Sequence, residues 1–533
     1  MPRARRLTSI LLACLVLAAG FVATSPRTAQ ADAATIYRLV NEARWAAGLG
    51  GVARNGSLDA VAQRWTQQMI ASGTMKHNPN LSAEVPGGWR ALGENVAKGF
   101  ATDQDLHNAW MGSPGHRANI LGAYNSIGIG WARDGSGRIW ATQVFATYTG
   151  VGAPSTPALP PVCPTSAQQP AWSQPASAGL GFTPITPARL VDSRTSDVVA
   201  GGCEMGKSTR IDVQVTGRGG VPASGVGAVA LNVTCVGARA STWLAAYPAG
   251  GTWPGTSSVN AVPGQDVAAS VVVPVGSNGK VSVLAGDRSC GLVVDVTGYF
   301  PTDGSGSRYT PATARRTFDA ATGSGTWRAV GTGAPVGATA IVGNVTLDQP
   351  RTGTYASVTP AATTVPSTSS INVGSGSTGA NRFLSRTNDT NLALFTSGQS
   401  RTIMDVNGWF SSTGLSYYPL APKRAVDTRS GLGLPGDLVA NRTSRATLAG
   451  ANGVPAGAKA VAVTVTMTGS THTSFLTAWQ AGQPRPATSD VNAVRGSSRA
   501  NLVLLPLDSS GRADLQVSYG STDVVVDVLG YFR

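Results

Sequence analysis

The chain has 533 residues and a formal net charge of +14, and only 13% of its residues are charged. This length exceeds what one hydrophobic core usually organises, so we expect several domains. The lysines and arginines form no dense run beyond the N-terminus, which argues against a nucleic-acid-binding protein. Its 66 glycines and 32 prolines favour strands and turns over long helices.

The N-terminus has the features of a secretory signal. Three arginines within the first six residues precede an apolar run over residues 7–23, and small residues flank a cleavage site near residue 31. We therefore predict a signal peptide over residues 1–31. Cys14 offers a lipoprotein alternative, which the long apolar run after it disfavours. No later run is long enough to span a bilayer, so we expect a secreted protein, extracellular or associated with the cell wall.

The next segment, residues 34–150, mixes helix and sheet. Apolar residues at helical spacing predict helices over 34–47 and 57–72, the second capped by Ser57. A capping box at residues 102–105 predicts a third helix. Residues 126–148 alternate and contain a glycine-rich turn, which predicts a β-hairpin.

Residues 151–180 are rich in Pro, Ser, Ala and Gln and predict a partly extended linker. The remainder repeats three times, over residues 181–301, 308–411 and 417–533, and the copies close with "VVDVTGYF", "IMDVNGWF" and "VVDVLGYF". Units of this length are too long for a solenoid, so each copy is expected to be an all-β domain, either a sandwich or a barrel.

The closing phrases are predicted to be equivalent final strands. Their valines should face the core. Their aspartates, Asp295, Asp405 and Asp527, should be satisfied by local hydrogen bonds.

Four cysteines follow the signal segment, an even number that suggests disulfides in an exported protein. Cys235 follows the "NVT" phrase of the first repeat and Cys290 precedes its closing phrase. The other two repeats lack both cysteines. Joint absence is what a bonded pair predicts, so we expect Cys235–Cys290, which leaves Cys163–Cys203 to tie the linker to the first repeat.

Three of the four histidines lie between residues 77 and 116. His77, His116 and Glu94, which lies between them, are ligand types of an open zinc-like site, in which one position is left for water or substrate. Their spacing is wide, so only the fold could bring them together.

Residues 34–150 resemble the CAP superfamily, which includes cysteine-rich secretory proteins, antigen 5 and plant pathogenesis-related proteins, in its bacterial exported form. The resemblance runs through "LVNEARWAAGL", His77, "GEN" at 93–95, "SPGHRANIL" at 113–121, "IGIG" and "WATQVF". It implies a three-layer α-β-α sandwich with a cleft. His77, Glu94 and His116 would be the cleft residues, with Asn95 and Ser113 lining it.

The resemblance also sets an expectation for metal binding. Animal and plant members have a glutamate three residues after the tryptophan that corresponds to Trp110, and this chain has Ser113 at that position. A divalent cation such as zinc is therefore expected to bind only weakly. The "SPGHR" phrase should end the third helix and turn His116 toward the cleft, whereas His107 is expected on the surface.

Two functions remain open. The first is a non-enzymatic binding protein with a cation or small apolar ligand, as the resemblance implies. The repeats resemble appended β-modules of exported bacterial proteins, and would either attach to cell-wall glycan or anionic surface polymer or act as spacers. The second is a secreted metal-dependent hydrolase or protease that uses the His/Glu cleft. A nucleophilic Ser113 assisted by His116 is a weaker version, because Ser113 lacks a nucleophile elbow. We favour the non-enzymatic function.

Overall fold

The computed structural model describes residues 28–47, 49–100, 103–152, 154, 161–174, 178–200, 202–286, 290–362, 365–388 and 390–533. The chain divides into two compact units, Met1–Leu159 and Pro160–Arg533. The predicted signal peptide as far as residue 27, with Cys14, lies outside the described residues, and so does Thr102 of the predicted capping box.

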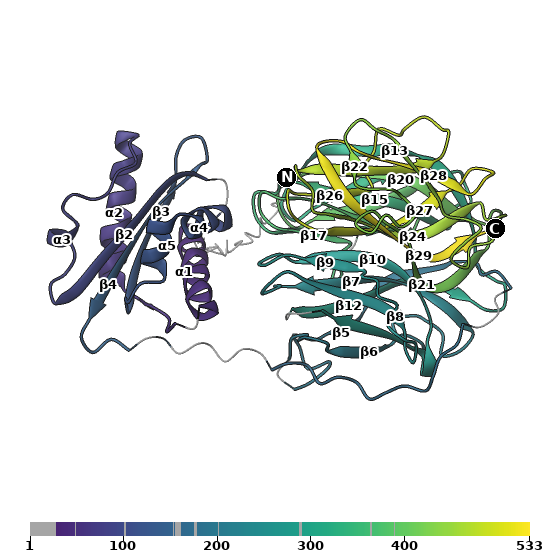
Figure 1. Cartoon of the computed structure of the whole chain (residues 1–533), viewed down its shortest axis with the longest axis horizontal. Coiled ribbons are helices and arrows are strands. Elements are labelled where there is room, and N and C mark those ends of the chain that lie inside the picture. The colour runs from purple at the N-terminus through teal and green to yellow at the C-terminus, as the bar shows by residue number, and fades with distance from the viewer. Residues whose placement is uncertain are drawn as a thin grey trace, which may run out of the picture. The chain divides into compact units, whose positions relative to one another are not determined.

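The first unit combines helices with one mixed sheet (Figure 1). Its helices are α1 (Thr28–Ala46), α2 (Gly56–Ser72), α3 (Leu81–Glu84), α4 (Asp103–Gly112) and α5 (Pro114–Ile120). Its strands are β1 (Ala53–Arg54), β2 (Trp89–Phe100), β3 (Ser126–Arg133) and β4 (Ile139–Tyr148), in the order β1-β3-β4-β2. Strands β3 and β4 pair antiparallel, which confirms the predicted hairpin.

Helices pack on both faces of this sheet (Figure 1). On one face, Ile139 and Phe145 of β4 pack with α1, α4 and α5. On the other, Val144 and its neighbours pack with α2. The glycines of "IGIG" lie where α2 crosses β3, and a Cβ atom on Gly130 would overlap the backbone of Ala62. Glycine is needed there because helix and strand approach so closely.

The cap of α2 differs from the prediction. Asn55, with extended backbone at φ −126°, accepts hydrogen bonds from the backbone N–H groups of Ser57 and Leu58 through its side chain. Ser57 is thus already inside the helix. Both residues suit an N-cap, and the chain selects Asn55 because its backbone leaves β1 in the extended conformation that a cap requires. The helix ends as predicted at Gly73, with φ 64°.

In the second unit one strand pattern occurs three times. Each repeat has one sheet in which its sixth, third, eighth and first strands lie in that order, and a second sheet with the order second, seventh, fourth, fifth. This is the strand order of an eight-stranded jelly roll. The shared order confirms the prediction that the repeats have one all-β fold.

The strands of each repeat have the following bounds. The first repeat contains β5 (Thr183–Asp192), β6 (Arg210–Gln214), β7 (Val226–Val236), β8 (Thr242–Pro248), β9 (Val259–Ala261), β10 (Val267–Pro274), β11 (Lys280–Ala285) and β12 (Gly291–Pro301), with a 3-10 turn at Ser277–Gly279. The second contains β13 (Arg308–Thr322), β14 (Thr326–Gly331), β15 (Ala340–Asp348), β16 (Thr354–Thr359), β17 (Ile371–Val373), β18 (Thr378–Arg386), β19 (Asn391–Thr396) and β20 (Ser400–Ser411). The third contains β21 (Tyr417–Asp427), β23 (Ser444–Thr447), β24 (Ala460–Thr468), β25 (Ser474–Gln480), β26 (Val491–Ala493), β27 (Arg499–Pro506), β28 (Arg512–Val517) and β29 (Ser521–Phe532), and adds β22 (Leu438–Val439).

Six buried aromatic rings join the three repeats at a common centre. Each repeat contributes one ring at the start of its opening strand, or directly before it in the case of Phe182, and one from its closing strand. Each opening ring contacts the closing ring of its own repeat and that of one neighbour, with centroids 4.7–5.4 Å apart. The rings are those of Phe182, Phe300, Tyr309, Phe410, Tyr417 and Phe532. These contacts close a cycle, so the three repeats form one body with a pseudo-threefold arrangement and not a linear row.

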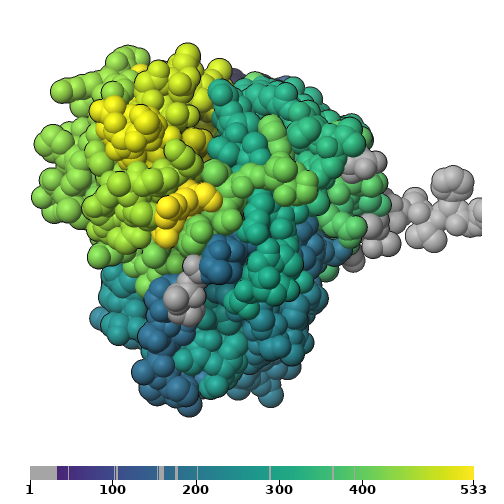
Figure 2. Space-filling view, turned by 90° about the vertical axis from the view of Figure 1, so that its right-hand side faces the viewer, coloured from purple at the N-terminus to yellow at the C-terminus, as the bar shows by residue number. Residues whose placement is uncertain are grey.

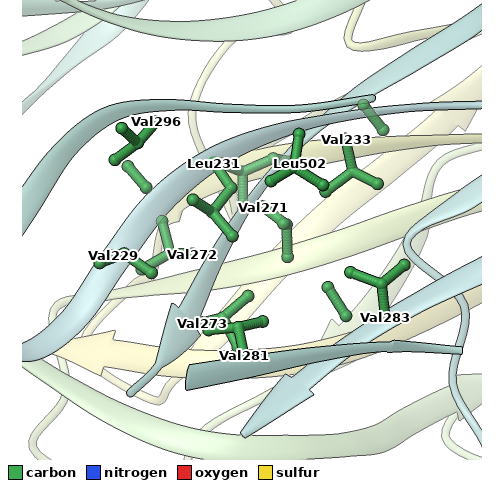
Figure 3. Packing of buried hydrophobic residues seen from close by; sticks show 14 of the residues in the cluster. Val229, Leu231, Val233, Val271, Val272, Val273, Val281, Val283, Val296 and Leu502 are labelled. Atoms are coloured by element: carbon green, nitrogen blue, oxygen red, sulfur yellow. The ribbon is translucent and has the colours of Figure 1, made fainter. Parts of the chain in front are cut away.

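The repeats also share a hydrophobic core. Leu502 of the third repeat lies among Val233 and Val271 of the first (Figure 3). In the space-filling view, the C-terminal residues, in yellow, lie among green residues of the third repeat, and these adjoin the teal of the earlier repeats (Figure 2). The valines of the closing strands are buried in these cores, as predicted.

The two predicted disulfides are present, Cys163–Cys203 and Cys235–Cys290, with Cα atoms 4.9 and 5.6 Å apart. The first holds part of the predicted linker against the first repeat. Ser166 N–H donates to the Arg210 carbonyl and Trp172 N–H to the Gly250 carbonyl. The later half of the predicted linker is therefore part of the second unit, because backbone hydrogen bonds and a disulfide fix it there.

The closing-strand aspartates all pair with an arginine of the opening strand of the same repeat. Arg189 Nε donates to Asp295, Arg316 Nε to Asp405 at 3.0 Å, and Arg424 Nε to Asp527 at 2.9 Å. This corrects the expectation of local hydrogen bonds, because each arginine lies about a hundred residues away in sequence and is close only since the first and last strands of each jelly roll are neighbours in one sheet. Asp405 is also only partly satisfied, since its Oδ2 atom is buried without a partner.

Candidate functional site

The residues predicted for the cleft gather around β2, the last strand in the order of the first sheet. Glu94 and Asn95 are consecutive on this strand, so their side chains leave it on opposite faces. His77 lies in the segment between α2 and α3, and His116 lies in α5. An edge strand lets groups from both faces of a sheet approach one another.

His77 and Glu94 form a direct pair. The Nδ1 atom of His77 lies 2.7 Å from Glu94 Oε2, and the backbone N–H of Asn78 donates to the same oxygen at 3.0 Å. The two partners differ in environment, since the His77 side chain is 64% exposed and that of Glu94 only 4%. Glu94 Oε1 is buried without a hydrogen-bond partner. A buried carboxylate thus orients an imidazole that faces solvent.

His116 approaches the same region from α5. Burial lowers the pKa of its imidazole, and the nearby charge of His77 lowers that pKa further. His116 is therefore neutral near pH 7, when its ring can accept as well as donate a hydrogen bond.

Asn95 positions α5 and does not line an open cleft. It is fully buried, donates to the His116 carbonyl at 3.1 Å and to Gln143 Oε1 at 2.9 Å, and accepts from Asn119 at 2.9 Å. This corrects the prediction that its side chain lines the cleft. The amide is buried because β2 turns it toward α5, where the helix would otherwise have unmet polar groups.

Ser113 is the N-cap residue of α5 and makes no side-chain capping hydrogen bond. Pro114 follows as the first helical residue, which suits its fixed φ and missing N–H. As predicted, the chain breaks between α4 and α5 at this point. No hydrogen bond found among the described residues connects the Ser113 hydroxyl to His77 or His116, so the contacts give no support to a serine nucleophile.

His107 is buried, contrary to the prediction. It is 5% exposed, and its Nδ1 atom has no hydrogen-bond partner. Burial and the positive charge of Arg38 lower its pKa to about 4. The reason is helical geometry, because a residue three positions before the buried Trp110 lies on the same face of α4.

The predicted metal centre needs three converging ligands. In the portion of the chain that the structure describes, no three His, Cys, Asp or Glu side chains are grouped so that they could hold a metal ion. His77 and Glu94 are brought together, but the coordination sphere with His116 is not formed, so the residues do not fit a three-ligand ion. Weak binding of a divalent cation stays a prediction.

Comparison with known proteins bears on the first unit. The model of the cysteine-rich secretory protein family, CAP, matches residues 37–145. Residues 37–145 form a CAP segment. A curated relative, the uncharacterized protein YkwD of Bacillus subtilis, is 29% identical over 128 residues, which are 22% of this chain and 49% of that protein. The chain thus spans about half the length of this relative.

Two solved structures are also similar to the CAP segment. An outer surface protein of Borrelia burgdorferi is 17% identical, with a TM-score of 0.22 over 22% of this chain and 95% of that chain. An extracellular protein containing an SCP domain from Bacillus anthracis is 23% identical, with a TM-score of 0.20 over 22% of this chain and 41% of that chain.

Residues that sequence reasoning did not single out complete the CAP site. Asn78 and Asn119 hold the Glu94 carboxylate and the Asn95 amide, respectively. Arg44, buried in α1, donates to the carbonyls of Ile120 and Gly122 and so fixes the end of α5. Asn119 lies within "SPGHRANIL", which carried the resemblance, and Asn78 directly follows His77, but the roles of both depend on contacts that no spacing reveals.

No helix within the described ranges is long and apolar enough to cross a membrane.

Proposed function

We propose that this chain is an exported, non-enzymatic binding protein. Its CAP segment would bind a small ligand beside His77, and its repeats would attach the protein to cell-wall glycan. The single observation that carries the proposal for the CAP segment is the pair in which buried Glu94 orients exposed His77. Export is supported by the two disulfides, which form in oxidising compartments, and by the arginine-led apolar N-terminus.

The ligand of the CAP segment would approach the open side of β2. The exposed His77 ring offers a hydrogen-bonding group at this position, and the neutral His116 ring offers a second. An α-β-α sandwich of the CAP kind would leave this edge open for a small apolar ligand with a polar end. We include no metal-dependent step, because the described residues do not group three ligands.

Attachment is assigned to the repeats because of their charge and their closed arrangement. Residues 151–533 hold 27 of the 41 basic residues and 19 of the 27 acidic ones, an excess of eight positive charges. A single body built from three similar modules can present several weak sites together, which raises avidity when their spacing matches the polymer.

The test separates the two units. Residues 28–159 and residues 160–533 are produced separately and mixed with purified cell walls, and the sedimented fraction is measured. The repeats should sediment, and residues 28–159, called the CAP unit below, should remain in solution. The reverse distribution would show that the assignment is wrong. Release at 1 M salt, where screening acts within about 3 Å, would indicate an anionic polymer in place of neutral glycan.

The CAP site is tested on the full chain with His77→Ala, and with His472→Ala as the control at an exposed histidine of the third repeat. Lipids, divalent cations and peptides are screened against both variants. Loss of ligand binding only in His77→Ala supports the proposal. Peptide cleavage by the unaltered chain that disappears in His77→Ala would instead establish the hydrolase alternative.

A further inference from the structure

A pocket of about 170 Å³ opens where the second repeat meets the third. One wall comes from the opening strand β13 and from the bulge of β20, and the other comes from β25, the loop that follows it and β27. Its lining residues include Pro311, Thr313, Asn407, Trp479, Gln483 and Pro484. The pocket therefore depends on the packing of two repeats and does not exist in one repeat alone.

The equivalent place between the first and second repeats is nearly closed. The equivalent strands β5, β12, β16 and β18, together with β7 and β10, line a pocket of about 20 Å³ there. By strand register, Thr297 takes the place of Asn407, and Thr359 takes the place of Trp479. The two junctions share their backbone plan, so the difference in volume comes from the side chains and loops. The junction of the second and third repeats thus has a larger pocket with an aromatic wall, and the junction of the first and second repeats lacks both.

The larger pocket offers no free charge. Asp490 is the charged residue of its lining, and both of its oxygens are engaged, by Arg382 Nη2 at 2.6 Å and by the Ala478 N–H at 2.8 Å. Arg382 also donates to Asn407 Oδ1. What remains for a ligand is the amide nitrogen of Asn407, the amides of Gln480 and Gln483, and the Thr313 hydroxyl. These groups are neutral donors and acceptors.

Apolar surface accompanies these polar groups. Prolines 311, 484, 486 and 506 line the pocket together with the indole of Trp479. The indole N–H is already bonded to the Gln483 carbonyl at 2.8 Å, so the ring presents carbon to the pocket. Small-ligand sites typically combine apolar walls with a few placed polar groups. The combination here suits a ring that has both hydroxyl groups and C–H faces.

We propose that this pocket binds one pyranose ring of an uncharged glycan chain. The inference rests on the proposed attachment of the repeats to wall glycan and identifies the binding site. A cavity of about 150 Å³ admits a benzene ring, so the volume fits a single ring and not an extended segment. The absence of an unpaired charge in the lining disfavours an anionic polymer, and the single-ring volume disfavours a proline-rich peptide.

The test uses the full chain and two matched variants. Thr313 and Thr186 are both exposed, and each lies two residues after the proline that pairs with the glycine of its closing strand. Thr313→Trp blocks the larger pocket, and Thr186→Trp places the same ring at the nearly closed junction. Calorimetric titrations use two uncharged probes, an N-acetylglucosamine tetrasaccharide and a glucose tetrasaccharide.

We expect at least one probe to bind at a single site, with affinity at least about tenfold weaker in Thr313→Trp and unchanged in Thr186→Trp. A Gln480→Ala/Gln483→Ala variant, which leaves the core intact, should weaken binding in the same direction. Failure of both probes, equal effects of the two tryptophans, or binding of a polyproline peptide alone would overturn the inference. If the repeats still sediment with walls in any of these cases, the attachment stands and only the pocket assignment fails.

Discussion

The two units place their buried charged groups in different surroundings. In residues 161–533, the buried carboxylates of the described part all pair with an arginine, as in Asp490–Arg382 and Asp427–Arg429. In the CAP unit, buried Glu94 pairs with a titratable histidine, and buried His107 has an unpartnered ring nitrogen. Arginine stays charged at all ordinary pH values, whereas histidine does not.

This difference distinguishes ion pairs that stabilise the repeats from a polar pair that is available to a ligand. In the repeats, permanently charged arginines occupy most of the buried carboxylate oxygens, although Asp212 Oδ2 and Asp405 Oδ2 have no partner. A carboxylate with one unpartnered oxygen beside an exposed imidazole can still form interactions. Unpartnered carboxylate oxygens occur in both units, at Glu94 in the first and at Asp212 and Asp405 in the second, so the feature that distinguishes Glu94 is the exposed imidazole of His77 beside it.

The largest effect is expected from breaking the buried pair between the second and third repeats. Arg382 is fully buried and its partner Asp490 is 3% exposed. Arg382→Ser should cost about 3–5 kcal/mol in the unfolding free energy of residues 160–533, because Asp490 is left buried and unpaired. The measurement is urea-induced unfolding.

The chain supplies its own control for this experiment. By strand register, Ser270 and Ser370 occupy the corresponding positions at the junction of the first and second repeats. The double variant Arg382→Ser/Asp490→Ser copies that junction and should recover most of the lost stability. A double variant as unstable as the single one would show that the pair is not the source of the cost.

The next prediction is that a fall in pH changes the stability of the two units in opposite directions. The pKa of His107 is about 4 in the folded CAP unit and about 6.5 when unfolded, so the unfolded state binds more protons between these values. Its stability should therefore fall as the pH drops from 6.5 to 4, by about 3 kcal/mol in total. Urea unfolding of residues 28–159 at several pH values measures this, and His107→Leu should flatten the profile.

The repeats should respond differently over the same range. Burial raises the pKa of Asp295 to about 6, although Arg189 opposes the shift. A carboxyl group with a raised folded pKa loses stability as the pH rises from its unfolded pKa through 6, so acidification toward pH 4 should stabilise this part of the second unit. A second unit that loses stability in parallel with the CAP unit would contradict the comparison.

Close approaches at glycine give a smaller test. In the CAP unit, a Cβ on Gly130 would meet the backbone of α2 at Ala62, whereas a Cβ on Gly530 of the third repeat would meet the ring of Tyr417. A helix backbone yields less readily than a side chain. Overpacking costs about 1–3 kcal/mol, and Gly130→Ala should lie at the upper end and Gly530→Ala nearer the lower end. Thermal unfolding of each unit separates the two, and equal losses would mean that the aromatic centre is as rigid as the helix.

Repetition explains why the second unit was the more predictable from sequence. Three copies show which positions change together, and this was enough to pair Cys235 with Cys290 and to align the closing strands. It did not reveal the ring of six aromatics, because packing between repeats depends on how whole sheets meet. Nor did it reveal that residues 161–174 are fixed to the first repeat, since their composition resembles that of a linker.

The CAP unit occurs once, so its motifs identified the residues of the site but not their environment. The motif residues His77 and Glu94 do meet. The burial of Asn95 and His107 was missed because it follows from the face that each residue presents within the folded sheet and helix. Helical spacing from Trp110 was the available signal for His107.

The smallest effect tests which of two nearby residues caps the N-terminus of α2. Asn55 and Ser57 are both good N-cap residues, and only Asn55 accepts from the first N–H groups of α2. Asn55→Ala should lower the unfolding free energy of the CAP unit by about 1 kcal/mol, whereas Ser57→Ala, already inside the helix, should change it by a few tenths at most. Urea unfolding of residues 28–159 resolves such a difference. A larger loss from Ser57→Ala would mean that the helix begins two residues later than the structure places it, and that α2 then meets β3 without the cap that fixes its first turn.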